Sequence, residues 1–138
     1  MQSDAELKNV TLRFYGALSG GDDAAIERLI SHQTGVLVIG TDPDEWWADY
    51  ATIVQIFKAQ MDEMGGGFPL LAGDIQAYRD GNVGWVADRP ALKLPDGNKL
   101  RFRMTAVLHR EEGEWKFVQW HVSLGVSNQE AFGKELTV

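Results

Sequence analysis

Residues 99–126, KLRFRMTAVLHREEGEWKFVQWHVSLGV, contain two runs of alternating apolar and polar side chains on either side of Glu111-Glu112-Gly113. Alternation with a period of two is typical of a half-buried strand, and a short Gly-containing segment between two such runs is typical of a hairpin. The stretch therefore predicts two long antiparallel strands, Lys99–Arg110 and Glu114–Val126.

The register of this hairpin decides which side chains share a face of the sheet. We expect a three-residue turn, which pairs Arg110 with Glu114 and places Arg103 opposite His121. In that register the polar side chains of both strands lie on one face and the apolar ones on the other. A two-residue turn would distribute polar side chains over both faces, and we therefore prefer the first register.

The two faces of the predicted hairpin differ strongly in character. One is apolar, with Leu100, Phe102, Met104, Ala106, Val118, Trp120 and Val122. The other is mixed, with Arg103, Thr105, Phe117, Gln119, His121 and Ser123. Because a wide apolar face is costly to expose, we expect it to form a homodimer interface. The mixed face then lies under the helices and lines a ligand pocket.

The preceding sequence predicts three helices, one short strand and two further long strands. Apolar residues at helical spacing predict helices over about residues 4–19, 22–30 and 49–64. The apolar run at 35–40 predicts a short strand, and 68–79 and 82–94 predict two longer ones. This segregation favours an α+β class, a curved antiparallel sheet with the helices on one face. The 138 residues, 44% of them hydrophobic, are expected to form one domain, 1–138.

Composition argues against several classes of function. The net charge of −7 and the absence of Lys and Arg clusters disfavour a nucleic-acid or membrane partner. The chain has no cysteine, which excludes disulfides, thiolate metal sites and a Cys nucleophile. The N-terminal residues MQSDAE lack the basic and apolar parts of a signal peptide, so we expect a cytoplasmic protein.

Two stretches resemble the SnoaL-like group of the nuclear-transport-factor-2-like superfamily, which includes ketosteroid isomerase and the association domain of calcium/calmodulin-dependent protein kinase. They are residues 38–46, VIGTDPDEW, and 115–123, WKFVQWHVS. The resemblance covers nearly the whole chain. It implies a cone of cystatin-like topology, closed by the helices and the curved sheet, with His121 and Arg103 pointing into a central pocket. Because the superfamily hosts isomerases, cyclases, dehydratases, binding modules and assembly domains, the resemblance leaves the function open.

His121 and Arg103 are the first candidates for chemistry. They could clamp a carboxylate or another anion, with His121 as general acid or base. Alternatively they form a buried polar pair that satisfies itself. Trp46 and Trp47 either cover the pocket mouth or fill the space beside the third helix. Further candidates for the pocket lining are Tyr15, Trp85, Thr105, Phe117, Gln119 and Ser123.

Carboxylates provide a second set of candidates. Asp42, Asp44 and Glu45 could move protons or hold a metal, but capping of a helical turn explains them more simply. Asp88 is a further catalytic candidate. Ketosteroid isomerase combines an Asp base with a Tyr and a protonated Asp. The nearest candidates for that trio are Tyr15, Asp42 and Asp88, and none of them lies in an isomerase motif.

The histidines and glycines give no sign of a cofactor. His32, His109 and His121 lack metal-ligand spacing, and no phosphate loop or dinucleotide fingerprint occurs, so no metal or cofactor is expected. Ser123 lacks the context of a hydrolase nucleophile.

The sequence leaves two hypotheses for the function. The first is a homodimer that binds a small, partly apolar, anionic molecule, and any reaction would be cofactor-independent proton transfer of the isomerase or lyase type. The second is a non-catalytic association module that forms a larger oligomer.

Overall fold

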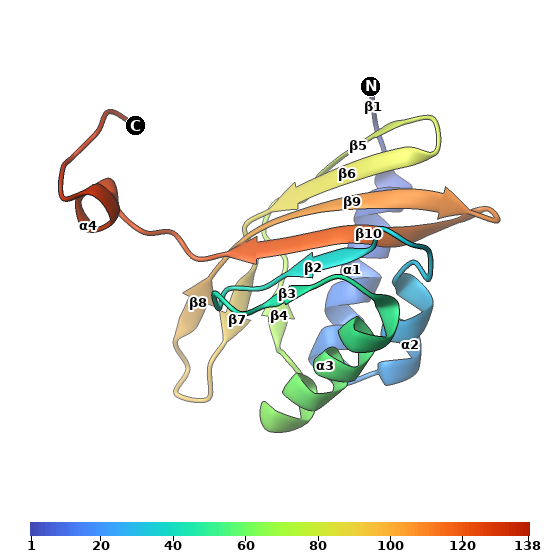
Figure 1. The fold of residues 1–138 in the computed structure, drawn as a ribbon, viewed down its shortest axis with the longest axis horizontal. Helices are drawn as coiled ribbons and strands as arrows, with labels where there is room; N and C mark the ends of the chain where they lie inside the picture. Colours follow the sequence, from blue (N-terminus) through green and yellow to red (C-terminus); the bar gives the residue numbers. More distant parts are fainter.

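The computed structural model describes all 138 residues and consists of a curved sheet with three helices on one side (Figure 1). The helices are α1 (Ala5–Gly20), α2 (Asp23–Leu29), α3 (Tyr50–Glu63) and, near the C-terminus, α4 (Asn128–Phe132). The strands are β1 (Gln2–Ser3), β2 (Leu37–Ile39), β3 (Trp46–Trp47), β4 (Leu70–Leu71), β5 (Gln76–Asp80), β6 (Val83–Asp88), β7 (Ala91–Lys93), β8 (Lys99–Arg101), β9 (Arg103–Glu111) and β10 (Glu114–Ser123). The α+β class predicted from the sequence is confirmed.

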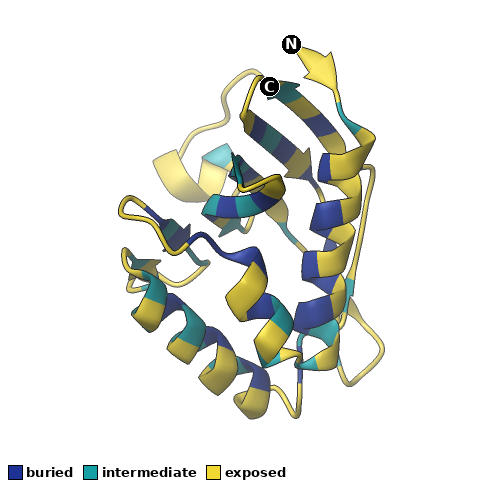
Figure 2. Cartoon of the chain, turned by 90° about the vertical axis from the view of Figure 1, so that its right-hand side faces the viewer, coloured by how far each residue is buried: buried dark blue, intermediate teal, exposed yellow.

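The three predicted helices agree with the structure to within one residue at each end. Each begins after an aspartate that accepts a backbone N–H three residues later, as Asp4 does from Leu7 at 3.0 Å and Asp49 does from Thr52 at 2.9 Å. α1 ends before Gly21, whose φ of 64° is the left-handed conformation that glycine adopts freely. The buried residues of α1 lie on the side that faces the rest of the molecule (Figure 2).

The main sheet has the strand order β1-β5-β6-β9-β10-β2-β3. All its neighbours are antiparallel except β10 and β2, which run parallel. Three predicted long strands are interrupted, because the chain enters the main sheet between β4 and β5, leaves it between β6 and β7, at Pro90, and returns to it between β8 and β9, at Phe102. The detached segments form a second sheet of order β4-β7-β8, which closes one end of the cone.

The predicted register of the β9–β10 hairpin is wrong. The turn has two residues, Glu112 at φ 52° and Gly113 at φ 81°, and it pairs Arg110 with Trp115. Positive φ at both turn positions is the geometry whose twist matches that of a hairpin. An extra residue in β10, Val118, then shifts the register.

Beyond this bulge Thr105 lies opposite His121, and Arg103 lies opposite Ser123. Polar residues therefore share one face there and apolar residues the other, as predicted. The bulge also places Phe117 on the apolar side, away from Gln119 and His121.

The prediction of which face lies under the helices is also wrong. Met104 is 1% exposed and Trp120 is 8% exposed. The Trp120 ring contacts Phe14 of α1 at 5.4 Å and Phe57 of α3 at 5.7 Å between centroids. Burying the apolar face against the apolar sides of the helices removes more hydrocarbon from water than burying the mixed face would. Met104, Ala106 and Trp120, which were expected to form part of a homodimer interface, are therefore buried within the chain itself.

Candidate functional site

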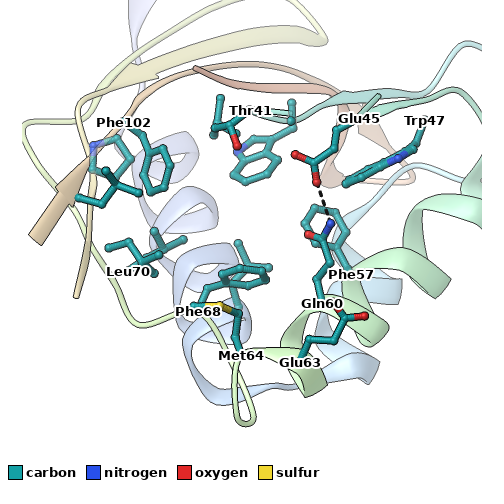
Figure 3. A pocket seen from close by; sticks show the side chains of 17 residues that line it. Thr41, Glu45, Trp47, Phe57, Gln60, Glu63, Met64, Phe68, Leu70 and Phe102 are labelled. Atoms are coloured by element: carbon teal, nitrogen blue, oxygen red, sulfur yellow. Dashed lines mark hydrogen bonds between the residues drawn. The ribbon is translucent and has the colours of Figure 1, made fainter. Parts of the chain in front are cut away.

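A cavity of about 360 Å³ lies between α3, the small sheet and the loop that joins β2 to β3. The side chains labelled in Figure 3 surround it. Five aromatic rings form much of its wall: Trp47, Phe57, Phe68, Phe102 and Trp120. Leu18, Met64, Leu70, Pro90, Leu92, Leu100 and Val122 add aliphatic surface. An apolar cavity with few polar groups is the usual form of a small-molecule site.

One carboxylate is held at this cavity by neutral donors. Glu45 precedes β3, and its Oε2 accepts a hydrogen bond from Gln60 Nε2 of α3 at 2.7 Å (Figure 3). Its Oε1 accepts the backbone N–H of Asp42 at 2.9 Å. Glu45 makes no ion pair with any Lys, Arg or His. Its charge therefore has no counterion in the chain.

Gly40 gives the Glu45 side chain its space. A Cβ atom at Gly40 would lie 2.5 Å from Glu45 Oε1 and 2.8 Å from Glu45 Cβ. Gly40, Thr41, Gln60 and Glu63 complete the lining, so Glu45 and Glu63 are its only charged residues.

Trp120 places one further polar atom near the cavity. Its indole Nε1 is buried and has no hydrogen-bond partner. The atom is fully covered in this arrangement, and we therefore count only Glu45, Gln60, Glu63 and Thr41 as polar groups available to a ligand.

Arg103 and His121, the predicted clamp, do not lie in the cavity. Both are exposed on the outer face of the main sheet, together with Thr105. Other predicted pocket residues also lie on this outer face: Trp85, Gln119 and Ser123, all half-buried. The prediction failed because it placed the mixed face inside the cone. The expectation of an anionic ligand rested on that placement, and the cavity lining contains no Lys, Arg or His that could bind an anion.

Tyr15 and Asp88 are brought together, but they do not line the cavity. The Tyr15 hydroxyl donates to Asp88 Oδ2 at 2.9 Å, and both side chains are buried. Asp88 also accepts the backbone N–H groups of Gly73 at 3.2 Å and Arg89 at 2.8 Å. Burial, followed by the charge of Asp88 and the hydrogen bond to it, raises the pKa of Tyr15. The pair is fully engaged within the core and joins α1 to β6.

The remaining aromatic candidates, Trp46, Trp47 and Phe117, lie in three different environments. Trp47 lines the cavity and packs edge-on against Phe57 at 6.1 Å, whereas Trp46, its neighbour in β3, is 64% exposed. Phe117 lies in the core, 4.6 Å from Phe14 between ring centroids. Of the predicted ligand-binding residues, none lines the cavity. Trp47 and Glu45, which the sequence left between alternatives, do line it.

The structure contains no group of three His, Asp or Glu side chains that could hold a metal ion. No helix is both long and apolar enough to span a bilayer.

The family model for the SnoaL-like domain matches residues 7–127, so the chain belongs to this family. The fold is similar to that of a nuclear-transport-factor-2-like protein of unknown function from Pseudomonas putida, with a TM-score of 0.78 and 14% identity over 96% of this chain and 92% of that one. It is also similar to a candidate ketosteroid isomerase from Shewanella frigidimarina, with a TM-score of 0.72 and 16% identity over 87% and 96%. A candidate calcium/calmodulin-dependent protein kinase type II association domain from Thiobacillus denitrificans has a TM-score of 0.74 and 17% identity over 86% and 94%. These identities establish the fold alone. No curated protein matches the sequence.

Proposed function

We propose that this protein binds a small, largely apolar molecule in the cavity beside α3. The observation that carries the proposal is the cavity itself, about 360 Å³ with five aromatic rings in its wall and one oriented carboxylate, Glu45. Buried hydrocarbon would supply most of the affinity, and the few polar groups would orient the ligand.

Glu45 is the group best placed for any chemistry on that molecule. A carboxylate can take a proton from an acidic C–H or O–H bond and return it elsewhere, which is the proton transfer that isomerases and dehydratases need. Gln60 would orient this base, since its amide donates to Glu45 Oε2. The Tyr15–Asp88 pair is not available for this role, because neither side chain lines the cavity.

A matched pair of leucines tests the binding proposal. Leu70 lines the cavity, whereas its neighbour Leu71 is exposed. Titration calorimetry with 1-naphthylmethanol, a neutral probe, should give saturable binding to the natural protein and to Leu71→Trp. Leu70→Trp should narrow the cavity and sharply reduce the binding heat. Equal binding by both variants, or no binding by the natural protein, would contradict the proposal.

We also propose that a second copy of the chain covers the outer face of the main sheet. This face has a row of paired residues that runs across five strands: Tyr78, Trp85, Val107, Gln119 and Leu37. No helix covers it. The chain after β10 extends away from the body (Figure 1) and carries Leu124, Val126, Phe132 and Leu136, each at least 40% exposed.

A twofold arrangement would bury both apolar surfaces at once, because each copy supplies one face and one C-terminal arm. Light scattering should give a dimer for the natural protein and a monomer for the double variant Trp85→Glu/Phe132→Ser. Leu12→Ser, which changes an exposed leucine of α1, is the control and should remain dimeric. A monomeric natural protein would contradict the proposal, and a larger ring would favour the association module instead.

A further inference from the structure

We infer that the ligand of the cavity is an organic cation, an amine or alkylammonium group on an apolar body. This inference rests on the proposed binding function and gives it a chemical class. It follows from three features of the cavity: the aromatic wall, the carboxylate without a counterion, and the sign of the charges around it.

The aromatic wall suits a positive charge. Phe57 lies at its centre, with the Trp47 ring 6.1 Å away at 76° and the Trp120 ring 5.7 Å away at 55°. All three rings line the cavity. The face of an aromatic ring attracts a cation, and Trp does so most strongly. A neutral hydrocarbon would also pack against this wall, so the carboxylate decides between the two.

Glu45 lacks the partner that a charge at an apolar cavity needs. Its two hydrogen bonds come from neutral donors, a backbone amide and the side-chain amide of Gln60. A carboxylate has about four acceptor positions, so two remain after these bonds. Partial burial makes an unpaired charge unfavourable, and a cationic ligand would supply the missing counterion.

The arrangement is specific to this side chain. Gly40 leaves room that a Cβ atom would occupy at 2.5 Å from Glu45 Oε1, and Gln60 fixes the other oxygen from α3. Glu45 also bonds to the loop at Asp42, but capping that loop needs only Oε1. The bond from Oε2 to a helix 15 residues away in sequence holds the carboxylate at the cavity.

The surrounding charges also favour a cationic ligand. Glu63 is the other charged residue of the lining, and no lining residue is basic. The whole chain has a net charge of −7, which attracts cations and repels anions at long range. An anionic ligand would therefore meet like charge both on approach and inside the cavity.

The test compares three probes of similar size and different charge: 1-naphthylmethylamine, 1-naphthylmethanol and 1-naphthoate. Titration calorimetry at neutral pH should show that the amine binds about tenfold or more tightly than the alcohol, because one charge-assisted hydrogen bond replaces a neutral one. The carboxylate should bind most weakly.

Two variants assign that preference to Glu45. Glu45→Gln should remove the preference for the amine, so that the amine and the alcohol bind with similar dissociation constants. Asp62→Asn changes the same charge on an α3 residue outside the cavity lining and should keep the preference. Thermal unfolding followed by circular dichroism checks that both variants fold. If Glu45→Gln fails to fold, Glu45→Asp, which keeps the charge but shortens the side chain, should reduce the preference in its place.

The outcomes distinguish failure of the cationic-ligand inference from failure of the proposed binding function. If the alcohol binds as tightly as the amine, the inference of a cationic ligand is wrong and the proposed binding function stands. A preference for the amine that survives in Glu45→Gln would likewise overturn the inference. If none of the three probes binds the natural protein, the proposed function itself fails.

Discussion

Asp88 and Glu45 both place a carboxylate against a glycine, yet they are bound in different ways. Asp88 is 6% exposed and accepts three hydrogen bonds, from the Tyr15 hydroxyl and from the backbone N–H groups of Gly73 and Arg89. The three donors come from three different segments of the chain, and the carboxylate holds these segments together. Asp88 therefore stabilises the fold, by joining α1, β6 and the loop that follows β4.

Glu45 is only half-buried and accepts two hydrogen bonds, one of them from a side chain whose own position depends on α3. Its remaining acceptor positions lie beside the aromatic cavity. The comparison shows that burial alone does not identify a functional carboxylate. A carboxylate whose partners are all supplied by the fold is structural, and one that lacks a counterion next to a cavity is a candidate for ligand binding.

The largest effect should follow loss of Asp88. Asp88→Ala leaves the buried Tyr15 hydroxyl and two backbone N–H groups without an acceptor. We expect the free energy of unfolding to fall by about 3 kcal/mol, since a buried unsatisfied group such as the Tyr15 hydroxyl costs roughly 1–3 kcal/mol and the two part-buried N–H groups add to this loss. Urea denaturation measures this change. A loss below about 1 kcal/mol would show that Asp88 is not structural.

The glycine beside Asp88 should be next in effect. A Cβ atom at Gly73 would lie 2.6 Å from the backbone oxygen of Arg89 and 2.7 Å from Asp88 Oδ1. Gly73→Ala should destabilise the protein by about 2 kcal/mol, because backbone cannot move aside as easily as a flexible side chain. Denaturation midpoints will show whether Gly73→Ala costs more than Gly40→Ala, and the reverse order would break the comparison.

The Tyr15 hydroxyl contributes a pH dependence at high pH. Its pKa is raised above the ordinary value of 10.0 by burial and by Asp88. Tyr15 therefore keeps its proton in the folded state where the unfolded chain loses it, so stability should fall as pH rises above about 10, by up to about 1.4 kcal/mol per pH unit.

Tyr15→Phe lacks this group and should lose less stability between pH 9 and pH 11. At neutral pH it should be about 1.5 kcal/mol less stable than the natural protein, because Asp88 loses one donor. Denaturation series at several pH values measure both effects. Parallel pH profiles for the two proteins would contradict the assignment.

The smallest effect on stability should come from Gly40. Gly40→Ala meets only Glu45, whose carboxylate can rotate away but whose Cβ, 2.8 Å from the new atom, can move only with the exposed loop at residues 41–44, so the free energy of unfolding should fall by about 1 kcal/mol. Binding of 1-naphthylmethylamine should nevertheless weaken several-fold, while binding of 1-naphthylmethanol changes little. A large stability loss with unchanged amine binding would reverse the roles given to the two carboxylates.

Local signals in the sequence were sufficient for the helices and the fold class. The aspartates at positions 4, 22 and 49 and the glycines after α1 and α3 act within one turn, so their effect can be read from neighbouring residues. The alternation in residues 99–126 likewise identified the last two strands.

The orientation of the sheet could not be read in the same way. Alternation separates two faces but does not say which one the helices cover, and the bulge at Val118 reverses the alternation partway along β10. Because of these two features, Arg103, His121 and Phe117 do not lie where the sequence predicted them.

The cavity depends on contacts between segments far apart in the sequence. Glu45 could be recognised as a capping residue because its bond to Asp42 is local, whereas its bond to Gln60 depends on how α3 packs. Phe68, Leu92 and Phe102 meet only because the chain leaves the main sheet to form β4, β7 and β8. No local pattern encodes that departure, although Pro90 marks one of its points.

The most direct test of the central claim is a crystal structure of the protein with 1-naphthylmethylamine. We expect the naphthyl ring to lie among Trp47, Phe57 and Phe102 and the ammonium nitrogen to be about 2.7–2.9 Å from a carboxylate oxygen of Glu45. An amine bound on the outer face of the sheet, or one in the cavity with its nitrogen directed away from Glu45, would contradict it.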